Sequence, residues 1–234
     1  MNIRAIVTGA TGMVGEGVLH ECLQDSRVKQ VLSVSRKPSG LTHPKLQELI
    51  VPDFYDLSAV ASQLKGYNAC FFCLGVSSVN LKEPDYYRLT HTLTMNMATL
   101  LSRQNPDMTF CYVSGMGTDS TEQGITMWAR VKGKTENNLM ALPFKQVFNF
   151  RPGYIHPTPD MKHTKSYYKY INWLYPILSR IVPSYVVTLQ QLSRAMINTV
   201  GQGKQRRILE VNDIKALGRG EGVRSEGRRV RSEE

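Results

Sequence analysis

Cysteine and long apolar runs are both scarce in this sequence. The 234 residues include four cysteines, too few for a disulfide framework in a chain of this length. No apolar run approaches the roughly 20 residues that a helix needs to cross a membrane. The N-terminus also lacks the charged, apolar and small-residue pattern of a signal peptide. These absences exclude a disulfide-rich secreted domain and predict a cytoplasmic protein.

Acidic residues are scarce in the second half of the chain. The sequence carries 29 Lys and Arg against 19 Asp and Glu, a net charge of +10, and residues 161–209 contain eight basic residues and no acid. Several tyrosines and a tryptophan lie among these basic residues. This composition fits a small-molecule substrate with an anionic group, a peripheral membrane contact or a contact in a homodimer. No nucleic-acid-binding motif accompanies it, so a nucleic-acid partner is not expected.

Short apolar runs alternate with helix-like segments along most of the chain. Six runs are typical of buried strands, over residues 3–8, 31–35, 49–51, 69–74, 109–114 and 146–150, and helices are expected between them. This alternation predicts an α/β fold, in the form of a doubly wound parallel sheet of the Rossmann type.

The alternation weakens after Arg151. We expect a single domain over residues 1–217, with a substrate-side segment at about 152–205 and a small C-terminal helical extension. Residues 218–234 mix Arg, Glu, Gly and Ser without apolar periodicity, which predicts a disordered tail.

The most informative motif is a glycine-rich turn that follows the first predicted strand and opens a helix. In this setting Gly9 allows a tight turn, Gly12 lets the backbone approach a pyrophosphate, and Gly15 lets the helix pack closely on the strand. The helix N-terminus offers free N–H groups to the phosphates. The motif therefore predicts dinucleotide binding by Gly9, Thr11, Gly12, Met13, Val14 and Gly15.

An acidic residue is missing where the second predicted strand ends. Proteins that bind NAD usually place Asp or Glu there to bond the ribose 2′-hydroxyl. This sequence has Arg36 and Lys37 instead, and both can pair with a 2′-phosphate. The site therefore favours NADP (as NADPH) over NAD.

These features resemble the short-chain dehydrogenase/reductase superfamily. The glycine spacing is similar to that of its extended and atypical members, which include sugar-nucleotide epimerases and the Tat-interacting-protein-type oxidoreductases. The resemblance covers about residues 1–211. It implies an adenine contact at Asp53 and Phe54, cofactor contacts at Leu74 and Gly75, a catalytic serine at Ser114, and a loop beside the nicotinamide formed by Pro152, Gly153, Tyr154 and Ile155.

The catalytic tyrosine of that superfamily is missing. Its Tyr-x-x-x-Lys pair lies on the helix after the fifth strand, where this sequence has Trp128 and Lys132. Positions four apart share one helix face, so the placement of the pair is retained. An indole does not ionise near neutrality, however, and cannot transfer the proton. Another group then supplies it, with Tyr154, Tyr86, Tyr87 and a water as candidates, or the protein binds NADP(H) without turnover.

Two functions therefore remain open. The first is an NADP(H)-binding oxidoreductase or epimerase-like enzyme, in which Lys132 also holds the cofactor. Its reacting end would be formed by Ser114, Trp128, Lys132 and Tyr154. The second is a non-catalytic NADP(H)-binding regulatory or interaction protein.

The Cys-x-x-Cys string formed by Cys70 and Cys73 does not indicate a metal site. Both cysteines lie in a predicted buried strand, where residues three apart face opposite sides of the sheet. The histidines show no ligand spacing either. We therefore expect core thiols and no bound metal.

Overall fold

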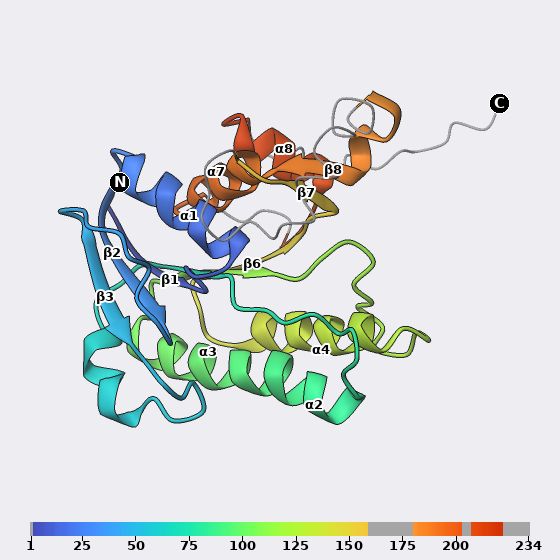
Figure 1. Cartoon of the computed structure of the whole chain (residues 1–234), viewed down its shortest axis with the longest axis horizontal. Coiled ribbons are helices and arrows are strands. Elements are labelled where there is room, and N and C mark those ends of the chain that lie inside the picture. Colours follow the sequence, from blue (N-terminus) through green and yellow to red (C-terminus); the bar gives the residue numbers. More distant parts are fainter. Residues whose placement is uncertain (1, 159–179, 203–206, 222–234) are drawn as a thin grey trace.

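The computed structural model describes residues 2–158, 180–202 and 207–221. These residues form a seven-stranded sheet between two layers of helices (Figure 1). The strands in chain order are β1 (Ile3–Thr8), β2 (Val28–Ser35), β3 (Leu46–Ile50), β4 (Ala69–Phe72), β5 (Thr109–Val113), β6 (Gln146–Arg151) and β9 (Ile208–Glu210).

The predicted doubly wound parallel sheet is confirmed. Its strand order is β3-β2-β1-β4-β5-β6-β9, and every neighbouring pair is parallel. The chain builds outward from β1 toward β3, then crosses back to β4 and builds in the other direction. Ligands of such sheets bind outside the carboxyl ends of the strands, at the point where the order reverses. That point lies between β1 and β4.

Helices cover both faces of the sheet. One face carries α1 (Met13–Gln24), α7 (Leu189–Thr199) and α8 (Val211–Gly218), and the other carries α2 (Glu83–Tyr87), α3 (Leu93–Gln104) and α4 (Met127–Ala141), as Figure 1 shows. A 3₁₀ helix, η1 (Ser58–Leu64), precedes β4. Successive strand residues point to opposite faces. Accordingly, Phe71 packs in the core with α1 and α7, and Phe72 in the core with α3.

Three local features differ from the sequence expectation. The single helix expected over residues 85–103 is divided by a π-helical turn, η2 (Arg88–Thr92), between α2 and α3. The short strands β7 (Tyr154–His156) and β8 (Val186–Thr188) pair in parallel, where only a loop was expected after β6. The helix α8 follows β9 directly. The paired strands β7 and β8 are anchored on the core, because Val187 is buried in it and Ile155 packs against it.

Several predictions fall outside the described residues. They concern the aromatic and basic residues of 159–179, the basic residues of 203–206 and most of the expected tail, 222–234. The membrane contact and the disordered tail therefore stay predictions.

Candidate functional site

The glycine turn joins β1 to α1 at the reversal point of the sheet. Gly9 has a φ of +71°, and a Cβ there would lie 2.8 Å from the carbonyl oxygen of Cys73 at the end of β4. A Cβ on Gly15 would collide with the carbonyl oxygen of Gly9. At Gly12, by contrast, the nearest atom to a Cβ is 3.5 Å away, and the residue is exposed. The turn is therefore tightly packed on its protein side, at Gly9 and Gly15, and accessible from solvent at Gly12. This arrangement fits a bound pyrophosphate.

The residues that follow Gly9 form an accessible helix N-terminus. Gly12 precedes α1 as its N-cap and provides no side-chain cap. Thr11 is exposed, whereas Met13 and Val14 are half-buried. The first N–H groups of α1 thus remain open to an anionic group, as the dinucleotide prediction requires.

Arg36 and Lys37 lie next to this turn. They follow β2, which pairs with β1 up to the contact of Thr8 with Val34. Both side chains are exposed, and the backbone there is held by a 2.6 Å bond from the Ser35 hydroxyl to the Lys37 carbonyl oxygen. Two exposed cations thus stand beside the glycine turn without burying their charge.

The expected adenine contacts occupy different environments. Asp53 is exposed, and its Oδ1 accepts a 2.8 Å hydrogen bond from the Tyr55 backbone N–H. The Phe54 side chain packs into the core, and its carbonyl oxygen accepts a 2.7 Å bond from Asn96. Of this pair, Asp53 alone presents its side chain to solvent.

The residues after β4 lie across the turn from Arg36. The Cys73 backbone N–H donates to the Thr8 hydroxyl at 3.1 Å, which joins the ends of β4 and β1. Leu74 is half-buried and Gly75 is exposed, with no atom within 4 Å of a Cβ built on it. This edge of the turn is consequently open as well.

Ser114 follows β5 and is turned inward. It is 5% exposed. Its hydroxyl donates to Glu136 Oε1 at 2.5 Å, and its N–H donates to the Phe150 carbonyl oxygen at 2.8 Å. The hydroxyl proton is therefore committed to the protein interior.

Trp128 and Lys132 share one face of α4, as their spacing predicts. The Trp128 indole is half-buried and lies against Gly117 in the loop after β5. The Lys132 ammonium donates to the carbonyl oxygen of Ser114. Burial lowers the pKa of Lys132 to about 8, and the nearby negative charge of Glu136 offsets part of this effect. Lys132 is thus a titratable amine at the predicted reacting end.

Sequence reasoning missed Glu136 and its partner Arg151. Glu136 lies one turn beyond Lys132 on α4 and is fully buried. Arg151, the last residue of β6, binds it through Nη2 to Oε2 at 2.5 Å and Nε to Oε1 at 3.1 Å. The guanidinium also donates to the Ser120 hydroxyl at 2.6 Å and reaches Glu210 at 3.4 Å. The sequence did hold a signal for Glu136. Positions 128, 132 and 136 are four residues apart, so an acid at 136 lies on the same face of α4 as Trp128 and Lys132.

The segment after β6 borders the same place. Met116, in the loop after β5, donates its N–H to the Pro152 carbonyl oxygen at 2.9 Å. A Cβ on Gly153 would collide with the Tyr185 carbonyl oxygen. Tyr154 and Ile155 belong to β7 instead of a free loop, and the Tyr154 hydroxyl is buried. The structure therefore brings Pro152 and Gly153 close to the β5 loop.

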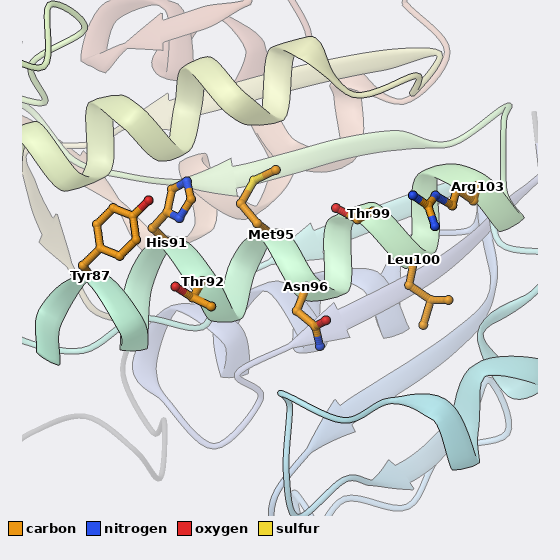
Figure 2. A pocket seen from close by; sticks show the side chains of 8 residues that line it. All are labelled: Tyr87, His91, Thr92, Met95, Asn96, Thr99, Leu100 and Arg103. Atoms are coloured by element: carbon orange, nitrogen blue, oxygen red, sulfur yellow. The ribbon is translucent and has the colours of Figure 1, made fainter. Parts of the chain in front are cut away.

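The other two tyrosine candidates lie elsewhere. Tyr86 is 1% exposed, and burial raises the pKa of its hydroxyl. Tyr87 stacks on His91 with ring centroids 4.4 Å apart. Tyr87 and His91 line a groove along α2, η2 and α3 (Figure 2). The groove has a volume of about 500 Å³, and its lining includes neither Ser114 nor Lys132. Tyr86 is thus closed to solvent, and Tyr87 is held against His91 in this groove.

The cysteines are free thiols, as expected. Cys70 and Cys73 pack on opposite sides of the sheet. Among residues 2–158, 180–202 and 207–221 no group of three His, Cys, Asp or Glu side chains is placed to hold a metal ion. Within the same ranges no helix is long and apolar enough to span a membrane.

The basic residues of 161–209 do not gather at the site as far as the structure describes them. Arg194 pairs with Glu21 on α1 at 3.1 Å. Arg207 donates to the Met140 carbonyl oxygen at 3.4 Å. An anionic substrate contact by this segment stays a prediction, because five of its eight basic residues lie outside the described ranges.

Known proteins match both the sequence and the fold. Over 150 residues the chain is 26% identical to "Protein FMP52-1, mitochondrial" of Scheffersomyces stipitis, which covers 64% of this chain and 66% of that protein. The chain thus spans slightly less than two thirds of this relative's length. A UDP-N-acetylglucosamine 4-epimerase from Methanobrevibacter ruminantium, solved with UDP-N-acetylmuramic acid, superposes with a TM-score of 0.65 at 14% identity, over 89% of this chain and 76% of that one. The Bordetella bronchiseptica enzyme WbmF, solved with NAD+, gives 0.64 at 13% identity, over 92% and 77%.

These relatives correct the expected location. The cytoplasmic prediction rested on the lack of a signal peptide and on cysteine usage. It is contradicted by curated relatives from several fungi, which are named mitochondrial. Neither feature separates the cytoplasm from another reducing compartment, which is why the prediction was wrong.

The family follows from the sequence match, together with the glycine turn and the parallel sheet. Residues 5–125, more than half of the chain, match the family described as NAD dependent epimerase/dehydratase. The matched range contains β1 to β5 and the glycine turn, which fits an NAD(P)-binding, epimerase-like protein. The chain belongs to the NAD dependent epimerase/dehydratase family.

Proposed function

We propose that the protein is an NADP(H)-dependent oxidoreductase or epimerase-like enzyme with an altered catalytic pair. The observation that carries this proposal is the outward-open glycine turn with Arg36 and Lys37 beside it at the end of β2. Two exposed cations in this position suit a 2′-phosphate, and no acid replaces them as the ribose partner of NAD. The cofactor, when bound, supplies or takes the hydride.

The residues of the chain have separate roles in this proposal. Gly9, Gly12 and Gly15 hold the pyrophosphate, with the open N–H groups of α1 facing it. Asp53 borders the adenine. Lys132 and the segment Pro152–Ile155 surround the ribose and the nicotinamide. Ser114 supports this end from inside, because its hydroxyl is bonded to Glu136. The substrate is a small molecule, and an anionic one is proposed from the basic segment.

The cofactor proposal is tested by titrating NADPH and NADH against the full chain. We expect NADPH to bind at least about tenfold more tightly, a difference of roughly 1.4 kcal/mol. Arg36→Asp should remove that preference. Lys29→Asp is the matched control, because Lys29 is exposed at the opposite end of β2 and donates to the Ser26 carbonyl oxygen. Equal affinities in the unchanged protein would refute the NADP assignment, and no binding of either nucleotide would refute the function.

A second function is favoured by Trp128 alone. Because an indole cannot transfer the proton, the protein could bind NADP(H) as a regulatory or interaction module without turnover. Substrate-dependent oxidation of NADPH across a panel of aldehydes and ketones would exclude this alternative. Activity that arises only in Trp128→Tyr would favour it.

We also propose a mitochondrial location, on the names of the curated relatives. Fractionation of cells that express the full natural chain tests it. Recovery with mitochondrial markers is the expected result, and recovery in the cytosol alone would contradict it.

A further inference from the structure

The reacting end of the site needs a group that can give and take a proton. Trp128 stands where the related enzymes are expected to carry tyrosine, and its indole cannot fill that role. Ser114 cannot fill it either, since its hydroxyl donates inward to Glu136 at 2.5 Å. Tyr86 is buried in the core, and Tyr87 is stacked on His91 in the α3 groove.

Lys132 remains at this place, one helical turn from Trp128. Its ammonium has three donors, and the Ser114 carbonyl oxygen accepts one of them. Its amine lies beside Gly115, which leaves 3.9 Å between Nζ and a Cβ built on that glycine. This spacing is ordinary van der Waals contact. Lys132 as a whole is half-buried, and its amine is held at the loop after β5, where the proposed reacting end lies.

The charges around Lys132 are already paired with one another. The acid nearest to it in the sequence of α4, Glu136, is bound by both Nε and Nη2 of Arg151 from β6. Arg151 in turn reaches Glu210 of β9. Among the described residues, then, the Glu136 carboxylate that faces Lys132 is already bound by two hydrogen bonds from Arg151. Glu136 therefore stabilises the charged form of Lys132 less than it would in an ion pair with Lys132 alone. Burial lowers the pKa of Lys132 to about 8.

We propose that Lys132 is itself the proton donor and acceptor of the reaction, in place of the missing tyrosine. This proposal rests on the function proposed above. In the reducing direction, hydride reaches the carbonyl carbon and the π electrons move to the oxygen. That oxygen takes a proton from the Lys132 ammonium, which leaves an alcohol, the oxidised cofactor and a neutral amine. A proton from the solution then restores the ammonium, so each reduction consumes one proton. In the oxidising direction the neutral amine accepts the hydroxyl proton.

The first test measures the titration of Lys132 without any turnover. Trace acylation of the full chain at pH 6–11, read by mass spectrometry, gives the labelling midpoint of each lysine. An unperturbed lysine has a midpoint at about 10.4. We expect Lys132 to become reactive about two pH units earlier. A midpoint at the reference value would overturn the proposal and leave NADPH binding unaffected.

The second test separates proton transfer from cofactor binding. Lys132→Arg keeps the charge, but a guanidinium stays protonated at every pH used. Oxidation of NADPH by 4-nitrobenzaldehyde and by diacetyl should fall at least about 100-fold in this variant, with NADPH affinity changed less than about tenfold. In the unchanged protein the rate should decline above the labelling midpoint of Lys132. Lys134→Arg, two residues along the same helix, is the matched control and should keep both activity and affinity.

Each other outcome has a defined meaning. Wild-type rates in Lys132→Arg would overturn the proposal, as would loss of activity in Tyr154→Phe with Lys132→Arg still active. Absence of oxidation at every pH, with NADPH bound, would overturn it too and favour the non-catalytic alternative. Failure to bind NADPH at all would instead refute the proposed function. Circular dichroism of each variant checks that the fold is retained.

Discussion

The carboxylate of Glu136 and the guanidinium of Arg151 form an ion pair inside the fold, with 2.5 Å between Oε2 and Nη2. The helix α4 contributes the acid and the strand β6 contributes the base. Because two parallel bonds join the groups, the pair fixes direction as well as distance. The Ser114 hydroxyl completes the set at the end of β5. The ion pair and the Ser114 hydrogen bond thus connect α4, the helix that carries Trp128 and Lys132, to the carboxyl ends of β5 and β6.

Arg151→Met is expected to lower the free energy of unfolding by about 3–5 kcal/mol, because it leaves the buried Glu136 carboxylate uncompensated. Urea denaturation at pH 7 measures this loss. Arg194→Met is the control, since Arg194 is half exposed where it pairs with Glu21, and such a pair contributes only about 0–1 kcal/mol. Similar small losses in both variants would show that Glu136 finds another partner or takes up a proton.

Gly12→Ala and Gly15→Ala should separate binding from folding. A Cβ on Gly12 has room in the structure but would stand where the pyrophosphate is proposed to approach. This variant should therefore keep its stability and bind NADPH at least about tenfold more weakly. A Cβ on Gly15 collides with the Gly9 carbonyl oxygen, so that variant should lose both. Thermal unfolding and fluorescence titration on the same samples provide the comparison. Unchanged affinity in Gly12→Ala would argue against a phosphate at this turn.

Gly133→Ala tests how the loop after β5 is held. A Cβ at this position of α4 would collide with the Asp119 carbonyl oxygen. Asp119 organises the loop by accepting bonds from the Thr121 N–H at 2.9 Å and the Gly124 N–H at 2.7 Å. Overpacking of this kind typically costs about 1–3 kcal/mol. Urea denaturation should show that loss, and hydrogen exchange should show weaker protection at residues 115–124. An unchanged loop would mean that α4 shifts instead.

The glycine turn and the α4 pair could be predicted because their requirements are local. Gly9 and Gly15 leave no room for a Cβ, and four-residue spacing alone places Trp128 and Lys132 on one face. The cores on both faces of the sheet follow equally from the apolar runs, since a buried parallel strand needs apolar residues in both directions.

Contacts between distant segments could not be predicted in the same way. Arg151 meets Glu136 only because β6 lies beside β5 and next to α4, and nothing in either residue's neighbours specifies that contact. The β7–β8 pair joins Tyr154 to Val186 across a long connection. The π-helical turn at residues 88–92 was likewise not predicted from the apolar pattern, which was interpreted as a single helix.

The stability of the protein should rise with pH above about 8 through Lys132. Burial lowers the pKa of this amine from 10.5 to about 8 in the folded protein. Below pH 8 both folded and unfolded chains carry the proton, and the folded chain bears the cost of a buried cation. Between about 8 and 10.5 the folded chain has lost this proton while the unfolded chain retains it, so the free energy of unfolding increases with pH. Lys132→Met removes that contribution.

The measurement is the difference in unfolding free energy between Lys132→Met and the unchanged protein, taken by urea denaturation from pH 7 to pH 10.5. The difference should shift by roughly 1–3 kcal/mol in favour of the unchanged protein as pH rises, at about 1.36 kcal/mol per unit of pKa change. Lys134→Met controls for the loss of a lysine from the same helix. A difference that stays flat across this window would mean that Lys132 is solvated or ion-paired in the folded protein. An amine in that state would keep its proton up to about pH 10.4, so between pH 8 and 10 it could not serve as the acceptor when an alcohol is oxidised.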